Sequence, residues 1–299
     1  MDIMKQAIQR KYHLLRYYYT QMSQLSFGNI TQSTVYKPLF FEFPEDPGAY
    51  TDIPNNVMIG QALKTSVNAV NLTQTETDFY FPAGTWCSLF EPVGDCITTE
   101  IGQTWPLPST LRDAFVHIRE GFVVPMQDAT KLKANTSVDL QNSPVDLHIL
   151  GQYRVPGIQS WAAEGLYVND DGLTVDTQGN VNQYYIKATY TQSGLVETIT
   201  VQFLQRMIAS NYLNTTTNCS AVNAADWLQT LYIYNADSFK QHDTWLAIVS
   251  YTDSEGDYFA IGTAQFDQKT NRIVLDNSQV PEQWVCLTRA FRLVLKAQG

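Results

Sequence analysis

Residues 114–125, Ala-Phe-Val-His-Ile-Arg-Glu-Gly-Phe-Val-Val-Pro, hold two short apolar-rich runs, at 114–119 and 121–125. Short runs rich in β-branched and aromatic residues, bounded by turn residues, are typical of β-strands. Further runs of this kind lie at 78–81, 82–86, 145–150, 165–168, 184–190, 196–203, 231–234, 245–251, 258–266 and 291–295. Their spacing predicts a mainly β chain with two consecutive β-sandwich domains, at residues 55–150 and 151–299, and a surface loop at 209–226.

The first 54 residues follow a different pattern. Apolar residues recur every three or four positions over 2–25, which predicts one helix of about six turns that ends at Ser26-Phe27-Gly28. The apolar stripe consists of Ile8, Tyr12, Leu15, Tyr19, Met22 and Leu25. Residues 38–44, Pro-Leu-Phe-Phe-Glu-Phe-Pro, are almost wholly apolar, which predicts a strand buried on both faces of a parallel sheet. Because a lone strand would expose both edges, we expect its neighbours to be encoded upstream.

Composition limits the classes of ligand. The 299 residues suffice for two compact units, and 44% apolar with 16% charged residues is typical of a folded protein. The formal charge is −10, from 19 basic and 29 acidic residues. Nucleic acids and anionic membranes need a concentrated basic surface, so we expect neither as a partner. No apolar run approaches the roughly 20 residues of a membrane span, and the first residues lack a signal-peptide core, so the chain is expected to be soluble.

Asparagine patterns indicate the secretory route. Five sites fit the Asn-x-Ser/Thr acceptor pattern for N-linked glycans, most of them in polar stretches. They are Asn29, Asn71, Asn135, Asn214 and Asn218. We therefore expect N-linked glycans and a location outside the cytosol.

The four cysteines are candidates for two disulfides. Cys87 and Cys96 bracket a short segment with a Gly-Asp turn, which suits a hairpin disulfide, and Cys219 would then pair with Cys286. Four buried thiols are the alternative, because pairing cannot be deduced from sequence. No Cys-x-x-Cys spacing supports a zinc site.

Read in order, five stretches resemble the C-terminal part of glycoside hydrolase family 31. They are residues 8–20, 37–44 (Lys-Pro-Leu-Phe-Phe-Glu-Phe-Pro), 81–86 (Phe-Pro-Ala-Gly-Thr-Trp), 118–126 (Ile-Arg-Glu-Gly-Phe-Val-Val-Pro-Met) and 166–172 (Leu-Tyr-Val-Asn-Asp-Asp-Gly). The resemblance covers essentially the whole chain, more strongly through about residue 172. It implies that residues 1–54 are the end of a (β/α)₈ barrel, its seventh helix and eighth strand, and that 55–150 and 151–299 are the proximal and distal β-sandwich domains.

The resemblance also implies what this chain lacks. Family members are retaining α-glucosidases and relatives, which hold two carboxylates about 5–5.5 Å apart. In the family these are Asp residues in a Trp-x-Asp-Met-Asn-Glu-like motif and a Gly-Asp-Asn-like motif on the fourth and sixth barrel strands. No Asp lies two residues after any of the six Trp residues, so no catalytic or substrate-binding residue is assigned. Departures inside the matched stretches are Lys37 for Arg, Leu173-Thr174 for Glu-Ser, and a polar segment at 60–68.

Other polar clusters favour structural interpretations. Asp253-Ser-Glu-Gly-Asp257 is spaced like the start of a calcium loop, but position 264 is Ala, which favours a hairpin turn. Asn169-Asp-Asp-Gly172 also indicates a turn. The four His residues, at 13, 117, 148 and 242, lack metal-site spacing, so neither a metal nor a cofactor is expected. Aromatic side chains could form a sugar platform, although buried packing is their commoner use.

Three functional hypotheses follow. The first is the C-terminal portion of an α-glucosidase, in an extracellular or a lysosomal or vacuolar location, that does not hydrolyse sugars alone. The second is a stand-alone secreted β-sandwich protein for glycan binding or scaffolding. The third is a subunit whose N-terminal helix and strand complete a barrel with a separate catalytic chain.

Overall fold

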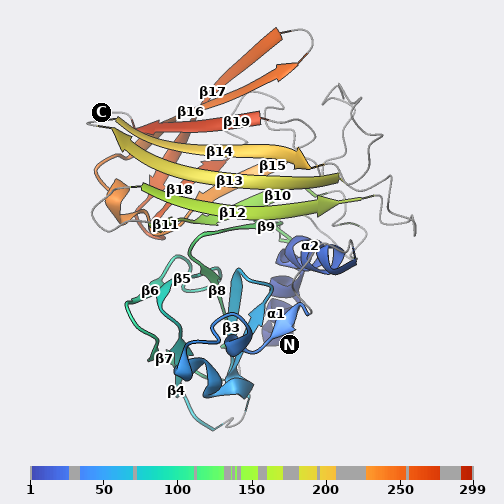
Figure 1. Ribbon diagram of the computed structural model, residues 1–299, viewed down its shortest axis with the longest axis vertical. Coiled ribbons are helices and arrows are strands. Elements are labelled where there is room, and N and C mark those ends of the chain that lie inside the picture. Colours follow the sequence, from blue (N-terminus) through green and yellow to red (C-terminus); the bar gives the residue numbers. More distant parts are fainter. Residues whose placement is uncertain are drawn as a thin grey trace.

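The computed structural model describes residues 2–26, 34–69, 73–110, 113–130, 136, 139, 143–153, 160–170, 182–193, 196–206, 227–253, 256–276 and 291–297. These residues are mainly β, with two helices at the N-terminus (Figure 1). The sheets lie in two units, a smaller one and a larger one, and the helices lie where the units meet. The prediction of a mainly β chain is confirmed.

The smaller unit contains a six-stranded antiparallel sheet in the order β1-β2-β3-β8-β5-β6. Its strands are β1 (Tyr36–Lys37), β2 (Asn56–Ile59), β3 (Leu63–Ser66), β5 (Gly84–Ser88), β6 (Cys96–Thr99) and β8 (Phe115–Arg119). A two-stranded ladder, β4 (Glu76–Phe81) with β7 (Gln103–Pro108), accompanies it. Apolar side chains from both sheets and from η1 (Leu39–Phe41), among them Leu39, Phe79 and Trp86, form one core.

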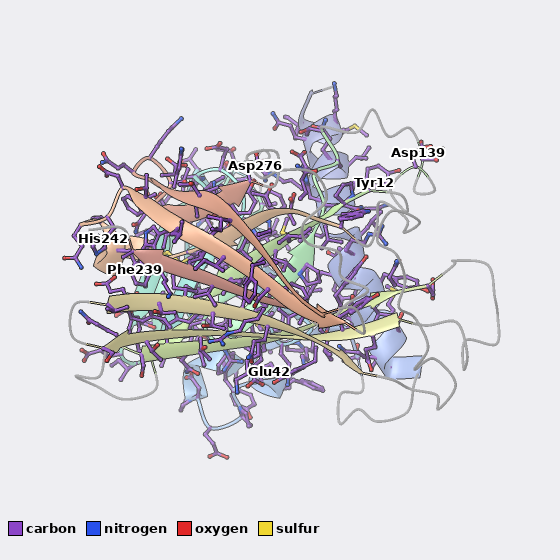
Figure 2. The ribbon with its side chains drawn as sticks, turned by 90° about the horizontal axis from the view of Figure 1, so that it is seen from above. Tyr12, Glu42, Asp139, Phe239, His242 and Asp276 are labelled. Atoms are coloured by element: carbon purple, nitrogen blue, oxygen red, sulfur yellow. A yellow bond between two sulfur atoms is a disulfide. The ribbon has the colours of Figure 1, made fainter. Side chains whose placement is uncertain are left out.

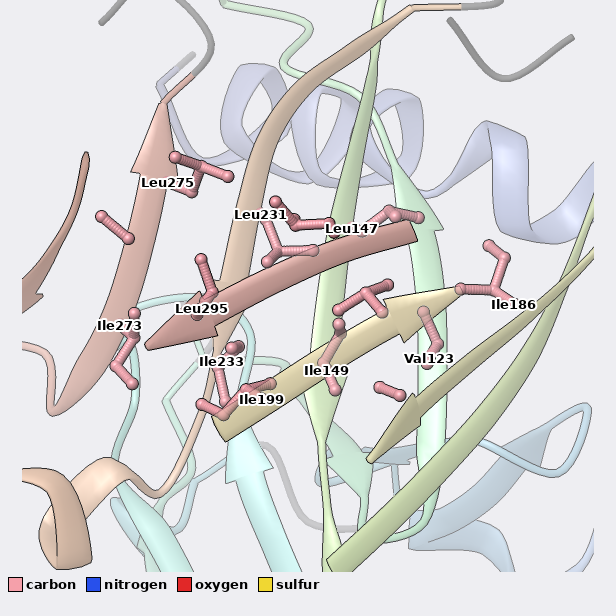
Figure 3. Packing of buried hydrophobic residues seen from close by; sticks show 14 of the residues in the cluster. Val123, Leu147, Ile149, Ile186, Ile199, Leu231, Ile233, Ile273, Leu275 and Leu295 are labelled. Carbon is pink, nitrogen blue, oxygen red and sulfur yellow. The ribbon is translucent and has the colours of Figure 1, made fainter. Parts of the chain in front are cut away.

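The larger unit is a closed sheet of ten strands in the order β12-β13-β14-β19-β16-β17-β18-β15-β10-β9. The ring closes where Glu164 of β12 pairs with Phe122 of β9, and β11 extends it beside β12. Its strands are β9 (Phe122–Met126), β10 (Val145–Leu150), β11 (Gln152–Tyr153), β12 (Ser160–Asn169), β13 (Asn182–Ser193), β14 (Val196–Arg206), β15 (Leu228–Ile233), β16 (Thr244–Asp253), β17 (Gly256–Asp267), β18 (Arg272–Asp276) and β19 (Phe291–Ala297). Figure 3 shows its aliphatic interior.

Strands β9 and β10 form a wall between two cores. All six residues of β10 are buried because alternate side chains of a strand point to opposite faces, and here both faces are covered. Val123, Leu147 and Ile149 face the interior of the ten-strand sheet, whereas Val124 and Leu150 belong to the core beneath the helices. Strands that precede residue 150 (β9 and β10) therefore pair in one sheet with strands that follow it (β12 and β15). The division into domains at that residue stays a prediction.

The predicted helix over 2–25 is two helices, α1 (Asp2–His13) and α2 (Leu15–Ser26), that meet at Leu14. Gln127 explains the break. Its backbone N–H donates to the carbonyl of His13 at 3.1 Å, and its side-chain amide donates to the carbonyl of Tyr12 at 2.9 Å. A group that takes over helix carbonyls in this way interrupts the intrahelical ladder.

The prediction of a buried strand at residues 38–44 is wrong. Leu39–Phe41 form the short 3-10 helix η1, and further 3-10 turns follow in η2 (Pro47–Tyr50) and η3 (Ile53–Asn55). The segment satisfies its backbone locally, since Phe43 N–H donates to the Leu39 carbonyl at 3.0 Å. Only Tyr36–Lys37, just before it, pair as a strand. Proline at both ends, Pro38 and Pro44, removes two N–H donors that a central strand would need.

Candidate functional site

Arg16 joins α2 to three segments at the ends of strands β9, β10 and β12 of the larger unit. The side chain is buried, and its Nε donates to the side-chain oxygen of Gln127 at 3.1 Å. One Nη donates to Oδ1 of Asn169 at 3.2 Å and the other to the carbonyl of Ser143 at 3.5 Å. One turn later, the Oγ1 of Thr20 accepts from the backbone N–H of Val168 at 3.1 Å. The inner face of α2 is therefore polar and fully engaged by strand ends.

Several large apolar side chains are exposed on the two helices. Met22 is 51% exposed, on the side of α2 away from Arg16 and Thr20, and Tyr19, at the edge of that side, is 40% exposed. Met4 and Ile8 are exposed on α1 as well. With Leu25, which is 37% exposed, these side chains include four of the six residues of the apolar stripe predicted from sequence. We call Met4, Ile8, Tyr19, Met22 and Leu25 the outer apolar face.

Glu42 shows how the chain accommodates Lys37. Lys37 contacts one carboxylate oxygen of Glu42, and Arg119 contacts the other at 3.5 Å. Arg119 also lies over the ring of Phe43, 4.4 Å from its centroid. One carboxylate thus binds two separate cations, so the forked contact that a single Arg would give is not needed here. Glu42 lies well away from Tyr12 and Asp139 in Figure 2.

The polar segment around Lys64 forms an internal network. The Lys64 ammonium is fully buried, donates to Oδ1 of Asn56 at 2.8 Å and to Oγ of Ser66, and lies 3.9 Å from the centroid of Phe81. Burial holds the Lys64 pKa well below its usual value, although nearby Asp52 opposes the shift. Burial and then the Lys64 charge lower the pKa of His117 to about 3. These groups are enclosed in the core and have a structural role.

Two cavities lie against the helices. The larger, about 350 Å³, lies between α1 and the smaller unit and is lined by side chains such as Arg10, Lys11 and Asp113. The other, about 200 Å³, lies between α2, the turn before β3 and strands β9, β12 and β13. We call it the glutamine cavity; its walls include Tyr17, Gln21, Gln24, Gln61, Phe122 and Glu164.

The predicted hairpin disulfide is present, between Cys87 and Cys96 on β5 and β6. Cys219 and Cys286 lie outside the described residues, as do the acceptor asparagines at 29, 71, 135, 214 and 218. Asp253 pairs with Gly256 in the turn between β16 and β17, so the hairpin expected there is confirmed. Asp170 accepts from the hydroxyl of Tyr19, and Asp171 is outside the described residues.

The four histidines occupy separate places. His148 Nδ1 contacts the Tyr234 hydroxyl at 2.8 Å, and burial holds the His148 pKa well below its usual value. His242 lies with Phe239 at one end of the larger sheet (Figure 2) and approaches Glu197 at 3.9 Å. Within the described part of the chain, no three His, Cys, Asp or Glu residues gather as a metal site would require. None of the described helices is long and apolar enough to cross a bilayer.

Sequence reasoning missed Arg16 and the glutamines of α2. Tyr17, Gln21 and Gln24 recur with spacings of four and three, which places them on one flank of a helix. That periodicity is visible in the sequence. The cavity that these side chains line could not be predicted, because its other walls come from β9 and β12, which are distant in the chain.

Comparison with known proteins agrees with this architecture. A family model described as the glycosyl hydrolase family 31 C-terminal domain matches residues 32–124. Lysosomal alpha-glucosidase of Bos taurus is 34% identical over 136 residues, which cover 42% of this chain and 14% of that protein. Probable maltase-glucoamylase 2 of Homo sapiens is 28% identical over 201 residues, 67% of this chain and 7% of that protein.

Solved structures show the same fold over nearly the whole chain. A crystal structure of the glucosidase II alpha subunit aligns with a TM-score of 0.71 at 18% identity, covering 98% of this chain and 28% of that one. A Flavobacterium johnsoniae GH31 dextranase aligns with a TM-score of 0.60 at 14% identity, covering 100% of this chain and 33% of that one. The chain thus matches a minor part of each relative's length. Residues 32–124 thus match the C-terminal domain of glycosyl hydrolase family 31, and the chain is homologous over part of its length to lysosomal alpha-glucosidases.

Proposed function

We propose that this chain is a non-catalytic platform, the C-terminal portion of an α-glucosidase-like protein, that packs against a catalytic (β/α)₈ barrel and does not hydrolyse sugars by itself. The observation that carries the proposal is the outer apolar face of α1 and α2. Arg16 and Thr20 fix the buried face of α2, and Met22 and Leu25 on the other side of the helix are 51% and 37% exposed.

The exposed face has the properties of a protein contact. Exposed apolar side chains that form a contiguous patch mark interaction surfaces, whereas scattered ones need no explanation. Here Tyr19, Met22 and Leu25 follow the three-residue spacing of one helix face. The occupant that fits is a neighbouring element of a barrel, since barrel helices pack side by side around the strands.

The sequence supports the assignment of catalysis to the barrel. Retaining hydrolysis of a glycosidic bond needs a nucleophilic carboxylate and a protonated partner held about 5 Å apart. The 299 residues contain neither family motif that carries those groups. The charged clusters described above, around Glu42 and Lys64, are ion-paired or enclosed in the core and have structural roles.

We further propose that the smaller unit acts as the proximal sandwich and the closed sheet as the distal one, and that the protein matures in the secretory pathway. The disulfide between Cys87 and Cys96 supports the second point, because such bonds persist in oxidising compartments. An extracellular or lysosomal location and N-linked glycans on the five acceptor asparagines belong to the same proposal.

The test is co-expression with a tagged barrel segment of a family 31 α-glucosidase that lacks its own C-terminal region. We expect the barrel to co-purify with the wild-type chain and to be lost with the double variant Met22→Asp/Leu25→Asp, two exposed positions of the outer apolar face. Phe259→Asp is the matched control, because Phe259 is also exposed but lies on β17, far from the helices (Figure 1). Retention by the double variant, or equal loss with Phe259→Asp, would contradict the proposal.

A further inference from the structure

Strand β17 has a free edge. It pairs with β16 from Gly256 to Gln265, whereas β18 pairs only with residues 265–267 of β17. Among the described residues, 256–264 therefore have a partner strand on one side only. Figure 1 shows the β16–β17 hairpin projecting beyond the rest of the larger unit. An unpaired strand edge is a template on which another strand can pair.

The register with β16 shows which backbone groups lie on the free edge. The Phe266 N–H donates to the carbonyl of Asp243 at 2.9 Å, in line with the β16 ladder. Because the bonding direction alternates along a strand, even-numbered residues of β17 face β16 and odd-numbered residues face the free edge. The four residues with N–H and carbonyl groups on the free edge are Asp257, Phe259, Ile261 and Thr263. No described residue pairs with these groups.

The side chains along the free edge are apolar and lack the usual protection. Phe259 is 71% exposed and Ile261 is 62% exposed. Natural edge strands are commonly protected by Lys, by Pro or by a β-bulge. Residues 256–264 contain no Lys, Arg or Pro, and the register with β16 runs without a bulge. The edge is therefore open to a further strand.

The sequence of this edge complements itself. In an antiparallel pair of two copies with the two-fold axis at Ala260, Phe259 of one copy lies opposite Ile261 of the other, and Asp257 lies opposite Thr263. All four edge residues then exchange N–H and carbonyl bonds with the second copy. An aromatic side chain opposite a β-branched one is a favourable cross-strand pair, and like charges opposite each other are unfavourable. Here the apolar pair forms in both directions, and no acidic residue faces another.

We propose that β17 pairs with β17 of a second copy of this chain, so that two closed sheets join edge to edge in a symmetric dimer. The axis lies at Ala260, because an axis at Ile261 would set Asp257 opposite Gln265, whose edge already pairs with β18. One strand edge buries little area, so the dimer is weak and transient. The edge lies far from the helices (Figure 1), so the dimer does not depend on contact with a barrel.

The experiment is sedimentation velocity of the full chain from about 1 µM to about 500 µM, the range in which small interfaces associate. The formal charge of −10 on each copy opposes association, so the buffer holds about 0.15 M salt, which screens charges beyond about 8 Å. We expect the mass to rise from one chain towards two. Ile261→Pro and Phe259→Lys should each weaken the dimer at least about tenfold. The proline removes an N–H that faces the free edge, so the β16 ladder keeps its bonds.

The matched control is Val196→Lys, which should dimerise like the wild type. Val196 is 56% exposed, but it lies on β14, which has partner strands on both sides. Thermal unfolding midpoints equal to that of the wild type would show that the variants fold. A wild-type chain that stays monomeric over the whole concentration range, or equal weakening in Val196→Lys, would overturn the dimer and leave the barrel test unaffected.

A cysteine on the axis tests the register directly. Residues on the axis of such a pair have Cα atoms about 4.5 Å apart, within the range of a disulfide. With oxidised glutathione, Ala260→Cys should therefore give a disulfide-linked dimer that neither the wild type nor Val196→Cys gives. The same yield of linked dimer from Val196→Cys, or none from Ala260→Cys, would overturn the pairing at Ala260.

Discussion

At the scale of single residues, buried polar groups hold α2 against the larger unit. Arg16 is the clearest case, because three acceptors from distant parts of the chain depend on its guanidinium. We expect Arg16→Met to lower the free energy of unfolding by about 2–4 kcal/mol, since it leaves buried acceptors without a donor. Arg10→Met is the control, because its contact with the Ala114 carbonyl is exposed, and it should cost less than about 1 kcal/mol. Urea unfolding measures both, and equal losses would contradict this role of Arg16.

His117 gives a pH dependence with a definite sign. Its pKa is lowered from 6.5 to about 3 in the folded chain, so between these values the unfolded chain binds the extra proton. The free energy of unfolding must therefore fall as the pH decreases through this window. Between pH ~6.5 and pH ~5 the contribution is about 2 kcal/mol, at 1.36 kcal/mol for each unit.

His117→Phe tests that sign. The ring of His117 packs edge-on against Phe81 at 5.1 Å between centroids, so Phe can take a similar position without a titrating group. Urea unfolding of the variant should show a smaller loss of stability between about pH 7 and pH 5 than the wild type does. A pH dependence identical to that of the wild type would show that His117 is not the titrating group.

At the scale of elements, the hairpin of β5 and β6 carries a covalent link. Cys87 and Cys96 are separated by nine positions. Closing a loop of about ten residues stabilises by about 2–3 kcal/mol in the chain-entropy description. We expect the double variant Cys87→Ser/Cys96→Ser to lose that amount in thermal unfolding, and the wild type to lose it on reduction. A melting curve unchanged by both treatments would mean that the link is not formed in solution.

The elements also show what could be predicted from sequence. Many of the strands, the hairpin disulfide and an amphipathic N-terminal helical segment are local patterns that the sequence predicts, whereas strands β2, β3, β6, β7 and β18 are not among the predicted runs. Which face of the helix is buried was not predicted, because periodicity identifies an apolar face without saying what covers it. The inner face uses Arg16, Thr20 and Ser23, whose burial depends on Gln127 and Val168 far along the chain. Residues 38–44 were mispredicted because apolar content outweighed the prolines at both ends.

At the scale of the whole molecule, two units share a wall and the helices lie across their junction. Because β9 and β10 face both cores, the units are expected to unfold together. Far-UV circular dichroism and tryptophan fluorescence should give coincident urea transitions, since Trp86 lies in the smaller unit and Trp245 in the larger. Two separated transitions would contradict a shared core.

As a whole molecule, the chain is proposed to be a platform without chemistry of its own. The most direct measurement is hydrolysis of 4-nitrophenyl α-D-glucopyranoside by the purified chain, followed as release of nitrophenolate. We predict no release above the buffer rate, because the 299 residues contain neither of the two family motifs that carry the acid and the nucleophile. Sustained turnover that is lost when one of the chain's own Asp or Glu residues is replaced would contradict this account.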